Sequence, residues 1–161
     1  MMTSTTKKRA LGVVVLATVA ALSYAAGAAK GKAAVNMPLA EMTWTPLMPG
    51  APLQIAKLWG DREKGEYAML LKIPAGFDSG MHTHTLDYHA VSIQGTWVHT
   101  NEGEANPKEL TPGSYVMQPG KQMHSDQCKG TQECITFIHQ HGKGDFIPAK
   151  PAAGAKPAEK K

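Results

Sequence analysis

The sequence predicts an all-β domain, either a sandwich or a barrel. Short apolar or alternating runs are separated by turn residues roughly every 8 to 12 positions, which is typical of these folds. The 161 residues fit one domain. After the N-terminal segment, no stretch repeats its apolar residues with the period of a helix. We therefore expect a single antiparallel β domain with flexible ends.

The first 28 residues have the features of a secretory signal peptide. A basic triplet at residues 7–9 precedes an apolar run over residues 10–22, and small residues follow. This run is shorter than the ~20 residues that a membrane-spanning helix needs. Cleavage between Ala25 and Ala29 is therefore favoured over an uncleaved anchor. We expect a secreted protein, in a bacterial periplasm, with no stable membrane insertion after cleavage.

Three further segments follow. Prolines recur between Val35 and Pro52, so residues 29–52 are expected to form an irregular arm laid over the core. Residues 53–148 are the predicted β domain. Its strand-like runs are 53–58, 67–73, 88–93, 97–100, 115–117 and 135–139. The Lys/Pro/Ala-rich residues 149–161 are typical of a disordered tail.

The distribution of charge argues against nucleic-acid binding. The whole chain has a formal net charge of +4 and a pI of about 9.1, but its basic residues concentrate at the two ends. Residues 33–148 carry 8 Lys or Arg against 12 Asp or Glu, which gives 8 − 12 = −4. A negatively charged domain repels phosphate.

Two cysteines flank a short turn. Cys128 and Cys134 enclose the sequence KGTQE, where a Gly-containing turn joins two candidate strands. In an oxidising compartment this spacing favours a disulfide that closes the hairpin, with two reduced structural thiols as the alternative. The sequence has no C-x-x-C motif, so thiol–disulfide chemistry is not the expected function.

The histidines are confined to one part of the chain. All seven lie between residues 82 and 141. His82 and His84 are two positions apart, so on a strand both imidazoles point to one face and can converge on a metal ion. His124 is the candidate third ligand, from a distant segment with a motif of its own.

The segment around His82 resembles the first of the two motifs of the cupin superfamily. Gly76 is followed after five residues by the His-x-His pair of His82 and His84, and Gly95 comes after ten more residues. That motif often supplies a Glu as fourth ligand. Tyr88 stands at the Glu position here, and residues 85–97 contain no Glu.

The segment around His124 resembles the second cupin motif. Gly113 is followed after five residues by Pro119, and His124 comes after four more. Lys121 stands where the motif has Gly, and Cys128 where it has Asn. The resemblance covers about residues 53–148. It implies a cupin jelly-roll β-barrel, or double-stranded β-helix. The sequence resembles the three-histidine branch of the superfamily, which includes dioxygenases and anti-sigma-factor-type cupins.

The resemblance implies one divalent metal ion held by His82, His84 and His124. Imidazole ligands favour no single ion: Fe(II) and Zn(II) are preferred here, and Mn, Ni and Cu remain open. Tyr88 and His89 are candidates for a fourth ligand or for supporting contacts. Strict alternation along the strand, however, places His89 opposite Tyr88.

The remaining candidates are expected to line the pocket or to lie elsewhere. Met81, Gln94, His99 and Met123 are predicted pocket-lining residues. Asp126 and Gln127 follow His124 and could orient it through a hydrogen bond. His139 and His141 form another His-x-His pair, for which the sequence shows no third ligand.

Two functions are compatible with these observations. The first is an exported metal-dependent cupin enzyme of the oxygenase type that acts on a small carbonyl or phenolic compound, with no catalytic residue assigned beyond the metal centre. The alternative is a non-catalytic cupin that binds or senses a metal or small ligand, a metal-free scaffold included. The expected partner is a small molecule, and cupins frequently form homodimers.

Overall fold

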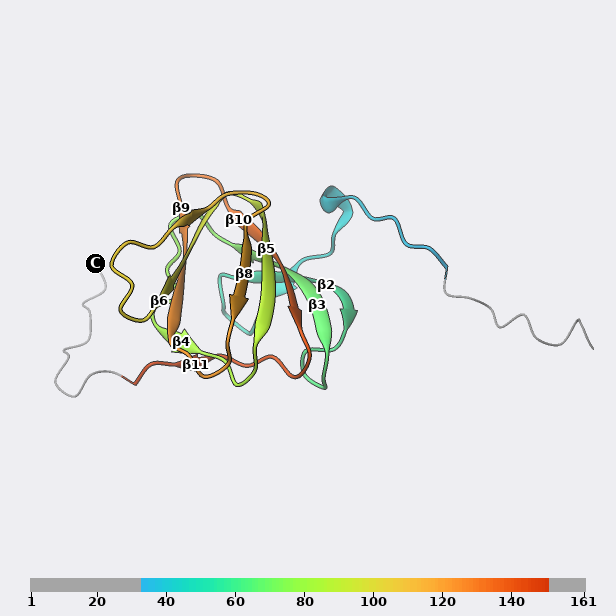
Figure 1. The fold of residues 1–161 in the computed structure, drawn as a ribbon. Helices are drawn as coiled ribbons and strands as arrows, with labels where there is room; N and C mark the ends of the chain where they lie inside the picture. Colours follow the sequence, from blue (N-terminus) through green and yellow to red (C-terminus); the bar gives the residue numbers. More distant parts are fainter. Residues whose placement is uncertain (1–32, 151–161) are drawn as a thin grey trace, which may run out of the picture. The chain divides into compact units, whose positions relative to one another are not determined.

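The computed structural model describes residues 33–150 (Figure 1). The predicted signal peptide, residues 1–28, and residues 151–161 of the predicted tail lie outside the described residues. Within the described part, no helix is both long and apolar enough to cross a membrane.

The regular secondary structure of the described chain is almost entirely β-strand. Its elements in chain order are η1 (Leu39–Glu41), β1 (Thr45–Pro46), β2 (Gln54–Gly60), β3 (Tyr67–Ile73), β4 (His82–Thr83), β5 (Tyr88–Gln94), β6 (Thr96–Asn101), β7 (Glu109–Leu110), β8 (Tyr115–Gln118), β9 (His124–Lys129), β10 (Cys134–Gln140) and β11 (Ile147–Pro148). All-β architecture was predicted, and it is confirmed. The six apolar runs identified in the sequence correspond to β2, β3, β5, β6, β8 and β10.

The strands form two antiparallel sheets. One sheet has six strands in the order β1-β2-β3-β10-β5-β8, and the other has five in the order β11-β4-β9-β6-β7. No continuous hydrogen-bonded ladder joins the two sheets of the described residues into a closed barrel. Non-consecutive strands are neighbours in both sheets, so each sheet contains residues far apart in sequence. This crossing brings the segments of His82 and His124 together, because β4 pairs with β9.

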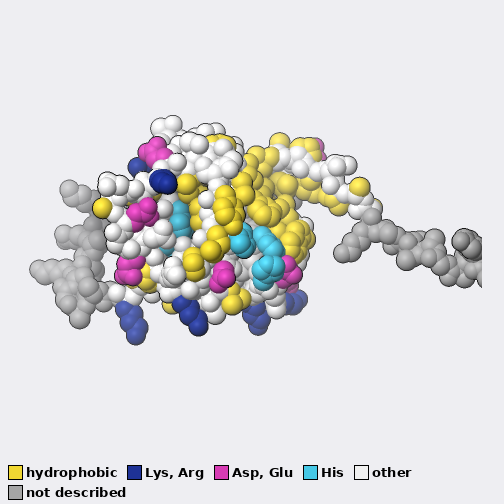
Figure 2. Space-filling view, in the orientation of Figure 1, with side chains coloured by type: hydrophobic (Ala, Val, Ile, Leu, Met, Phe, Trp, Pro, Cys, Tyr) yellow, Lys and Arg dark blue, Asp and Glu magenta, His cyan; other side chains and the backbone are white. Residues whose placement is uncertain are grey.

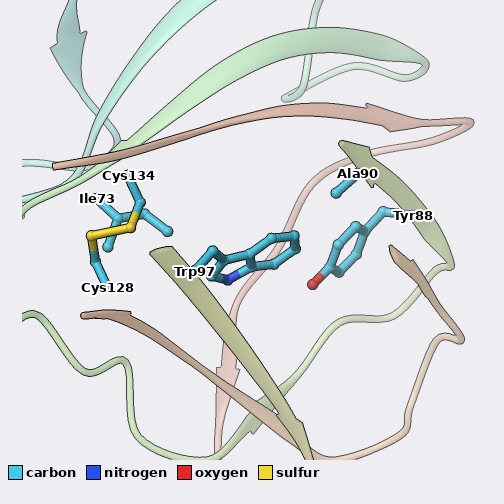
Figure 3. Close-up of a cluster of buried hydrophobic side chains, with 6 residues drawn as sticks. All are labelled: Ile73, Tyr88, Ala90, Trp97, Cys128 and Cys134. Atoms are coloured by element: carbon cyan, nitrogen blue, oxygen red, sulfur yellow. A yellow bond between two sulfur atoms is a disulfide. The ribbon is translucent and has the colours of Figure 1, made fainter. Parts of the chain in front are cut away.

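The hydrophobic core lies between the sheets. Ile73, Tyr88, Ala90 and Cys134 come from the six-stranded sheet, and Trp97 and Cys128 come from the five-stranded one. Figure 3 shows the Trp97 ring between the disulfide and the Tyr88 ring. The core therefore connects the disulfide at one end with a residue of the candidate site, Tyr88, at the other.

Cys128 and Cys134 form the predicted disulfide, with a Cα–Cα distance of 5.7 Å. The expected position in a hairpin is wrong, however. Cys128 lies on β9 and Cys134 on β10, and these strands belong to different sheets. The chain between them crosses from one sheet to the other, so the disulfide links the two sheets covalently.

The segment before the β domain lies against the outer face of the six-stranded sheet. Met42 and Trp44 pack against a buried cluster of Ala56, Leu70 and Ile135. The Lys72 ammonium lies 4.2 Å from the centroid of the Trp44 ring, within the range of a cation–π contact. This segment therefore covers the outer face of the sheet around Ala56, Leu70 and Ile135.

Candidate metal centre

The three predicted ligands are brought together by strand pairing and by one turn. His82 on β4 lies directly opposite His124 on β9, and His84 follows two residues after His82. The His82 ring centroid lies 4.2 Å from that of His124 and 5.0 Å from that of His84. One nitrogen from each of the three rings lies within 4.8 Å of the other two.

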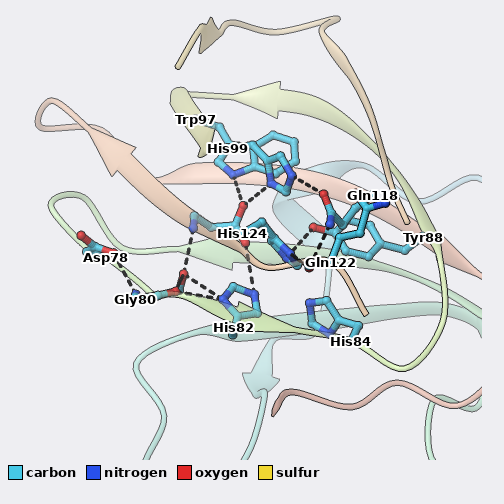
Figure 4. A network of polar contacts seen from close by, with 12 residues as sticks. Asp78, Gly80, His82, His84, Tyr88, Trp97, His99, Gln118, Gln122 and His124 are labelled. Carbon is cyan, nitrogen blue, oxygen red and sulfur yellow. Dashed lines mark hydrogen bonds and ion pairs between the residues drawn. The ribbon is translucent and has the colours of Figure 1, made fainter. Parts of the chain in front are cut away.

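Each of these rings is oriented by a backbone carbonyl. The Nδ1 atoms of His82 and His124 lie 3.0 Å and 3.1 Å from the carbonyl oxygens of Gly80 and Gln122 (Figure 4). The Nδ1 of His84 is bonded in the same way to the carbonyl of Asp145. A carbonyl oxygen only accepts hydrogen bonds, so each Nδ1 carries the proton and each Nε2 keeps its lone pair. Metal-binding histidines are oriented by the same kind of contact.

Burial favours the neutral form of His84 and His124. His82 and His124 are 2% and 0% exposed. Burial disfavours the charged ring and lowers the pKa of His124 from 6.5 to about 4, and the neighbouring His82 and His99 lower it further. Burial likewise lowers the pKa of His84. Neutral imidazole is the form that binds a metal ion.

A turn between β8 and β9 positions His84 and His124. Lys121 donates its backbone N–H to the carbonyl of His84, at 2.7 Å. Its φ angle is 63°, in the left-handed region that favours glycine. The cupin motif has Gly at this position, and this chain keeps the backbone conformation although a Lys stands there.

Asp126 joins the site from the same strand as His124. Since the two residues are two positions apart on β9, their side chains share a face. One carboxylate oxygen, Oδ1, accepts hydrogen bonds from Trp97 Nε1 and His99 Nδ1, each at 2.9 Å. The other, Oδ2, lies 3.6 Å from His82 Nε2. Asp126 is thus both a positioning group and a candidate oxygen donor.

The Asp126–His99 contact is an ion pair. Burial opposes the charged form of both groups, but the hydrogen bond between them outweighs it, so the pKa of His99 is raised and that of Asp126 is lowered. Both ring nitrogens of His99 have acceptors, because Nε2 lies 2.8 Å from the amide oxygen of Gln118. His99 was predicted to line the pocket; the structure places it behind Asp126 instead.

Tyr88 and His89 point to opposite faces of β5, as strict alternation predicts. The Tyr88 side chain is buried and its hydroxyl lies 3.4 Å from His124 Nε2. Burial and the nearby Asp126 charge raise the pKa of Tyr88 well above 10, so the phenol is protonated. The His89 ring lies on the outer face, where its Nδ1 is 2.7 Å from the Tyr115 hydroxyl. The structure therefore brings Tyr88, and not His89, to the three histidines.

A cavity opens beside the histidines and is mostly apolar. It has a volume of about 90 Å³, and roughly 10–15 Å³ is enough for one water, so a small organic molecule fits. His82, His84 and Tyr88 are at its wall. The other lining side chains are Leu47, Leu53, Arg62, Tyr67, Met69, Leu71, Ile73, Phe77, Ser79, Trp97, Asp126, Thr136, Ile138, Gln140, Asp145 and Phe146.

Two polar atoms of this lining have no hydrogen-bond partner among the described residues: Arg62 Nε and Thr136 Oγ1. Thr136 is 1% exposed. A buried hydroxyl without a partner costs about 1–3 kcal/mol. Such groups in a cavity are expected to pair with a bound molecule.

The other residues predicted to line the pocket are not at this cavity. Met81 and Met123 directly precede His82 and His124 in the sequence, but neither side chain lines this cavity. Met123 lines a separate surface hollow beside Lys121. The Gln94 side chain donates to the carbonyl of Glu133, near the end of β5.

The donor set fits a transition-metal dication. Three neutral imidazoles with free Nε2 atoms suit zinc, iron, copper and nickel, and the Asp126 carboxylate could add an oxygen. His82, His84 and His124 would hold the ion, while the backbone carbonyls of Gly80, Asp145 and Gln122 would orient them.

Comparison with known proteins agrees with this fold. The family model described as "Domain of unknown function (DUF4437)", a cupin-like family, matches residues 34–159. Comparison with curated proteins finds no match.

Three solved structures illustrate the similarity. The polyketide cyclase RemF from Streptomyces resistomycificus matches with a TM-score of 0.61 at 13% identity, over 74% of this chain and 88% of that one. An RmlC-like cupin protein from Ralstonia eutropha matches with a TM-score of 0.54 at 24% identity, over 70% and 71%. A predicted oxalate decarboxylase from Thermotoga maritima matches with a TM-score of 0.52 at 17% identity, over 67% and 99%. At these identities the matches show the cupin fold alone, which confirms the predicted fold.

Proposed function

We propose that this chain, which belongs to the DUF4437 family and has a cupin fold, is a metal-dependent enzyme of the oxygenase type. Its substrate would be a small carbonyl or phenolic compound. One divalent metal ion would be held by His82, His84 and His124. The observation that carries the proposal is the orientation of these three rings, each with Nδ1 bonded to a backbone carbonyl.

This orientation supports metal binding for a physical reason. The Nε2 atoms of His82, His84 and His124 lie a few Å apart with lone pairs directed away from the backbone, and the long Tyr88 contact to His124 is the one hydrogen bond that the described residues offer them. Such a cluster of acceptor atoms is costly unless something binds there. A bound dication would supply a Lewis acid and, as Fe(II), a site for O₂. Cupin structures similar to this chain include enzymes, which is compatible with catalysis.

The cavity supports a small and largely apolar substrate. Its walls are mainly Leu, Ile, Met and aromatic side chains, which favour a hydrocarbon or aromatic body. The unpaired Arg62 Nε and Thr136 Oγ1 would each pair with a substrate oxygen, because both can donate a hydrogen bond. A carbonyl or phenolic oxygen meets this requirement.

Tyr88 would act at the boundary between the metal and the substrate. Its hydroxyl reaches His124 Nε2 and its ring is at the cavity wall. The protonated phenol could donate a hydrogen bond to a substrate oxygen close to the three histidines. Asp126 Oδ2 lies 3.6 Å from His82 Nε2, so the carboxylate could add an oxygen ligand to an ion bound by His82.

Export to the periplasm is part of the proposal. The N-terminal sequence supports it, and so does the disulfide, because disulfides persist in oxidising compartments.

The test is elemental analysis of the exported chain, purified without a His tag or chelator. We expect about one tightly held metal ion per chain, lost in the His82→Ala/His124→Ala variant and retained in His89→Ala, which removes a histidine from the outer face. O₂ uptake is then measured with a panel of small diketones and phenols. Thr136→Val should raise KM for a true substrate while the metal content stays unchanged.

Other outcomes separate the alternatives. A redox-inert ion, together with no O₂ uptake on any compound, would favour the binding or sensing cupin. If the parent protein and the double variant are equally metal-free, and added metal fails to bind the parent, the proposed centre is wrong.

A further inference from the structure

We propose that Glu66, His139 and His141 form a second transition-metal site, on the outer surface of the six-stranded sheet. The sequence offered His139 and His141 as a His-x-His pair with no third ligand. The fold supplies that ligand as a carboxylate from the loop between β2 and β3. This proposal does not rest on the inner centre or on the proposed activity.

Strand register brings the three residues together. On β10, His139 pairs with Ala68 and Gln140 with Tyr67 of β3. Continuing this antiparallel register by one residue places His141 opposite Glu66. His139 and His141 share the outer face, while Gln140 between them points into the inner cavity.

The three side chains already converge on one atom. Glu66 Oε1 lies 2.9 Å from His139 Nε2 and 3.1 Å from His141 Nδ1, and the two imidazole centroids are 4.6 Å apart. One ligand atom from each residue lies within 4.8 Å of the others. Both nitrogens face one carboxylate oxygen. A small metal ion can therefore take the place of the hydrogen-bonding protons between them if the side chains move slightly apart.

The surroundings suit an ion that enters from solvent. The His141 side chain is 74% exposed and that of His139 is 23% exposed. Figure 2 shows histidine side chains beside acidic ones at the surface on this side of the molecule. Two imidazoles and one carboxylate leave further coordination positions, which water from the solvent can fill.

The donor set selects a class of ion. Imidazole suits zinc, copper and nickel, and the carboxylate offsets part of the charge of a dication. For a site of nitrogen and oxygen ligands, Cu²⁺ generally binds most tightly among the divalent first-row ions. The proposed ligand is therefore a late first-row dication, and Cu²⁺ is the most sensitive probe.

Trp59 gives this site its own reporter. Its ring centroid lies 5.2 Å from that of His139, and the residue is 47% exposed. A Cu²⁺ ion bound to His139 would quench the fluorescence of Trp59 at this short range. Zn²⁺ has a filled d shell and would not, so it serves as a competitor that restores the emission.

The experiment is a titration of the full chain with CuCl₂, followed by tryptophan fluorescence and, in parallel, by equilibrium dialysis. We expect a saturable quenching phase that excess Zn²⁺ reverses. Glu66→Gln and His141→Ala should each raise the Cu²⁺ concentration at half-maximal quenching at least ~10-fold. That is the lower end of the loss in metal affinity seen when a residue that only supports a ligand is removed. Glu63→Gln is the matched control: it makes the same charge change in the same loop, at a side chain that is 72% exposed, and should titrate like the parent.

Two further variants separate this site from the inner one. Trp59→Phe should lose the quenching phase but bind the same amount of copper by dialysis. The His82→Ala/His124→Ala variant should keep the phase, even if the inner centre binds no metal. Trp97 lies beside the inner centre, so the decisive Trp59→Phe measurement is made in the His82→Ala/His124→Ala background. If Glu66→Gln and His141→Ala quench like the parent, or if the phase persists in Trp59→Phe in that background, the second site is refuted.

Discussion

Replacing Asp126 with Asn tests the buried network that supports the three histidines. The substitution keeps the shape of the side chain and removes its charge. In the parent, Asp126 Oδ1 accepts two hydrogen bonds, from Trp97 and His99, and the carboxylate is only 16% exposed. Asn can still accept these bonds, but both become bonds to a neutral group.

The expected cost follows from these two contacts. A hydrogen bond to a charged group contributes about 1.5–3 kcal/mol, and a neutral one about 0.5–1.5 kcal/mol. The difference is about 1 kcal/mol for each bond, so the free energy of unfolding should fall by about 2 kcal/mol. For a domain of this size that lowers Tm by about 8 °C. The exposed Asp87→Asn should change the free energy by less than about 0.5 kcal/mol.

The effect should depend on pH. The folded pKa of His99 is raised, so its contribution to stability is fully present below its unfolded value of 6.5 and is lost as pH rises through the folded pKa. That of Asp126 is lowered, so its contribution is present above 3.8 and is lost as pH falls through the folded pKa. The deficit of Asp126→Asn should therefore be largest between about pH 4 and 6.5.

The assay is urea unfolding of the chelator-treated protein at pH 5.5 and 8.5, together with an NMR titration of the His99 ring. In Asp126→Asn, the pKa of His99 should fall below its parent value, because burial is no longer opposed by the carboxylate. The reasoning is refuted if the variant unfolds within about 0.5 kcal/mol of the parent at pH 5.5. An unchanged His99 pKa would refute the ion pair itself.

Three other substitutions or treatments have defined outcomes. Reducing the Cys128–Cys134 disulfide should lower the free energy of unfolding by about 2 kcal/mol, the loop-closure value for a sequence separation of 6, measured by urea unfolding with and without reductant. Lys121→Gly should raise it by about 0.5–1 kcal/mol, since Gly adopts the left-handed φ without the side-chain clash; a lower value would contradict that assignment. Thr136→Val should raise it by about 1 kcal/mol, because a buried hydroxyl without a partner is removed, and a loss would mean that Oγ1 has a partner.

The strands that the sequence revealed each contain a run of apolar residues. β9 was not among the apolar runs, although it is six residues long, and its sequence HSDQCK explains why. Its inward positions are His124, Asp126 and Cys128, which serve the candidate site and the disulfide instead of an ordinary core. Inward and outward residues alternate along β9, but the inward ones are mostly polar, so the pattern of hydrophobic residues does not reveal the strand.

The site could be predicted only as far as its motifs extend. The three histidines stand at cupin spacings, so their identity was accessible from sequence. Asp126 shares a strand face with His124, and the alternation of β9 was the available signal. Glu66 carried no signal at all, because it meets His139 and His141 only through the pairing of β3 with β10, whose paired residues are 61 to 73 positions apart in sequence.

The sheet-crossing disulfide also has a consequence for local opening of the native protein. The two sheets enclose the cavity without a continuous ladder between them, so their separation would otherwise need only the loss of side-chain packing. The bond between Cys128 and Cys134 couples β9 to β10, and transient opening at this end requires both sheets to move as one cooperative unit. In the oxidised protein, amide hydrogens of the two strands should therefore exchange at similar, slow rates, whereas after reduction the five-stranded sheet can open by itself.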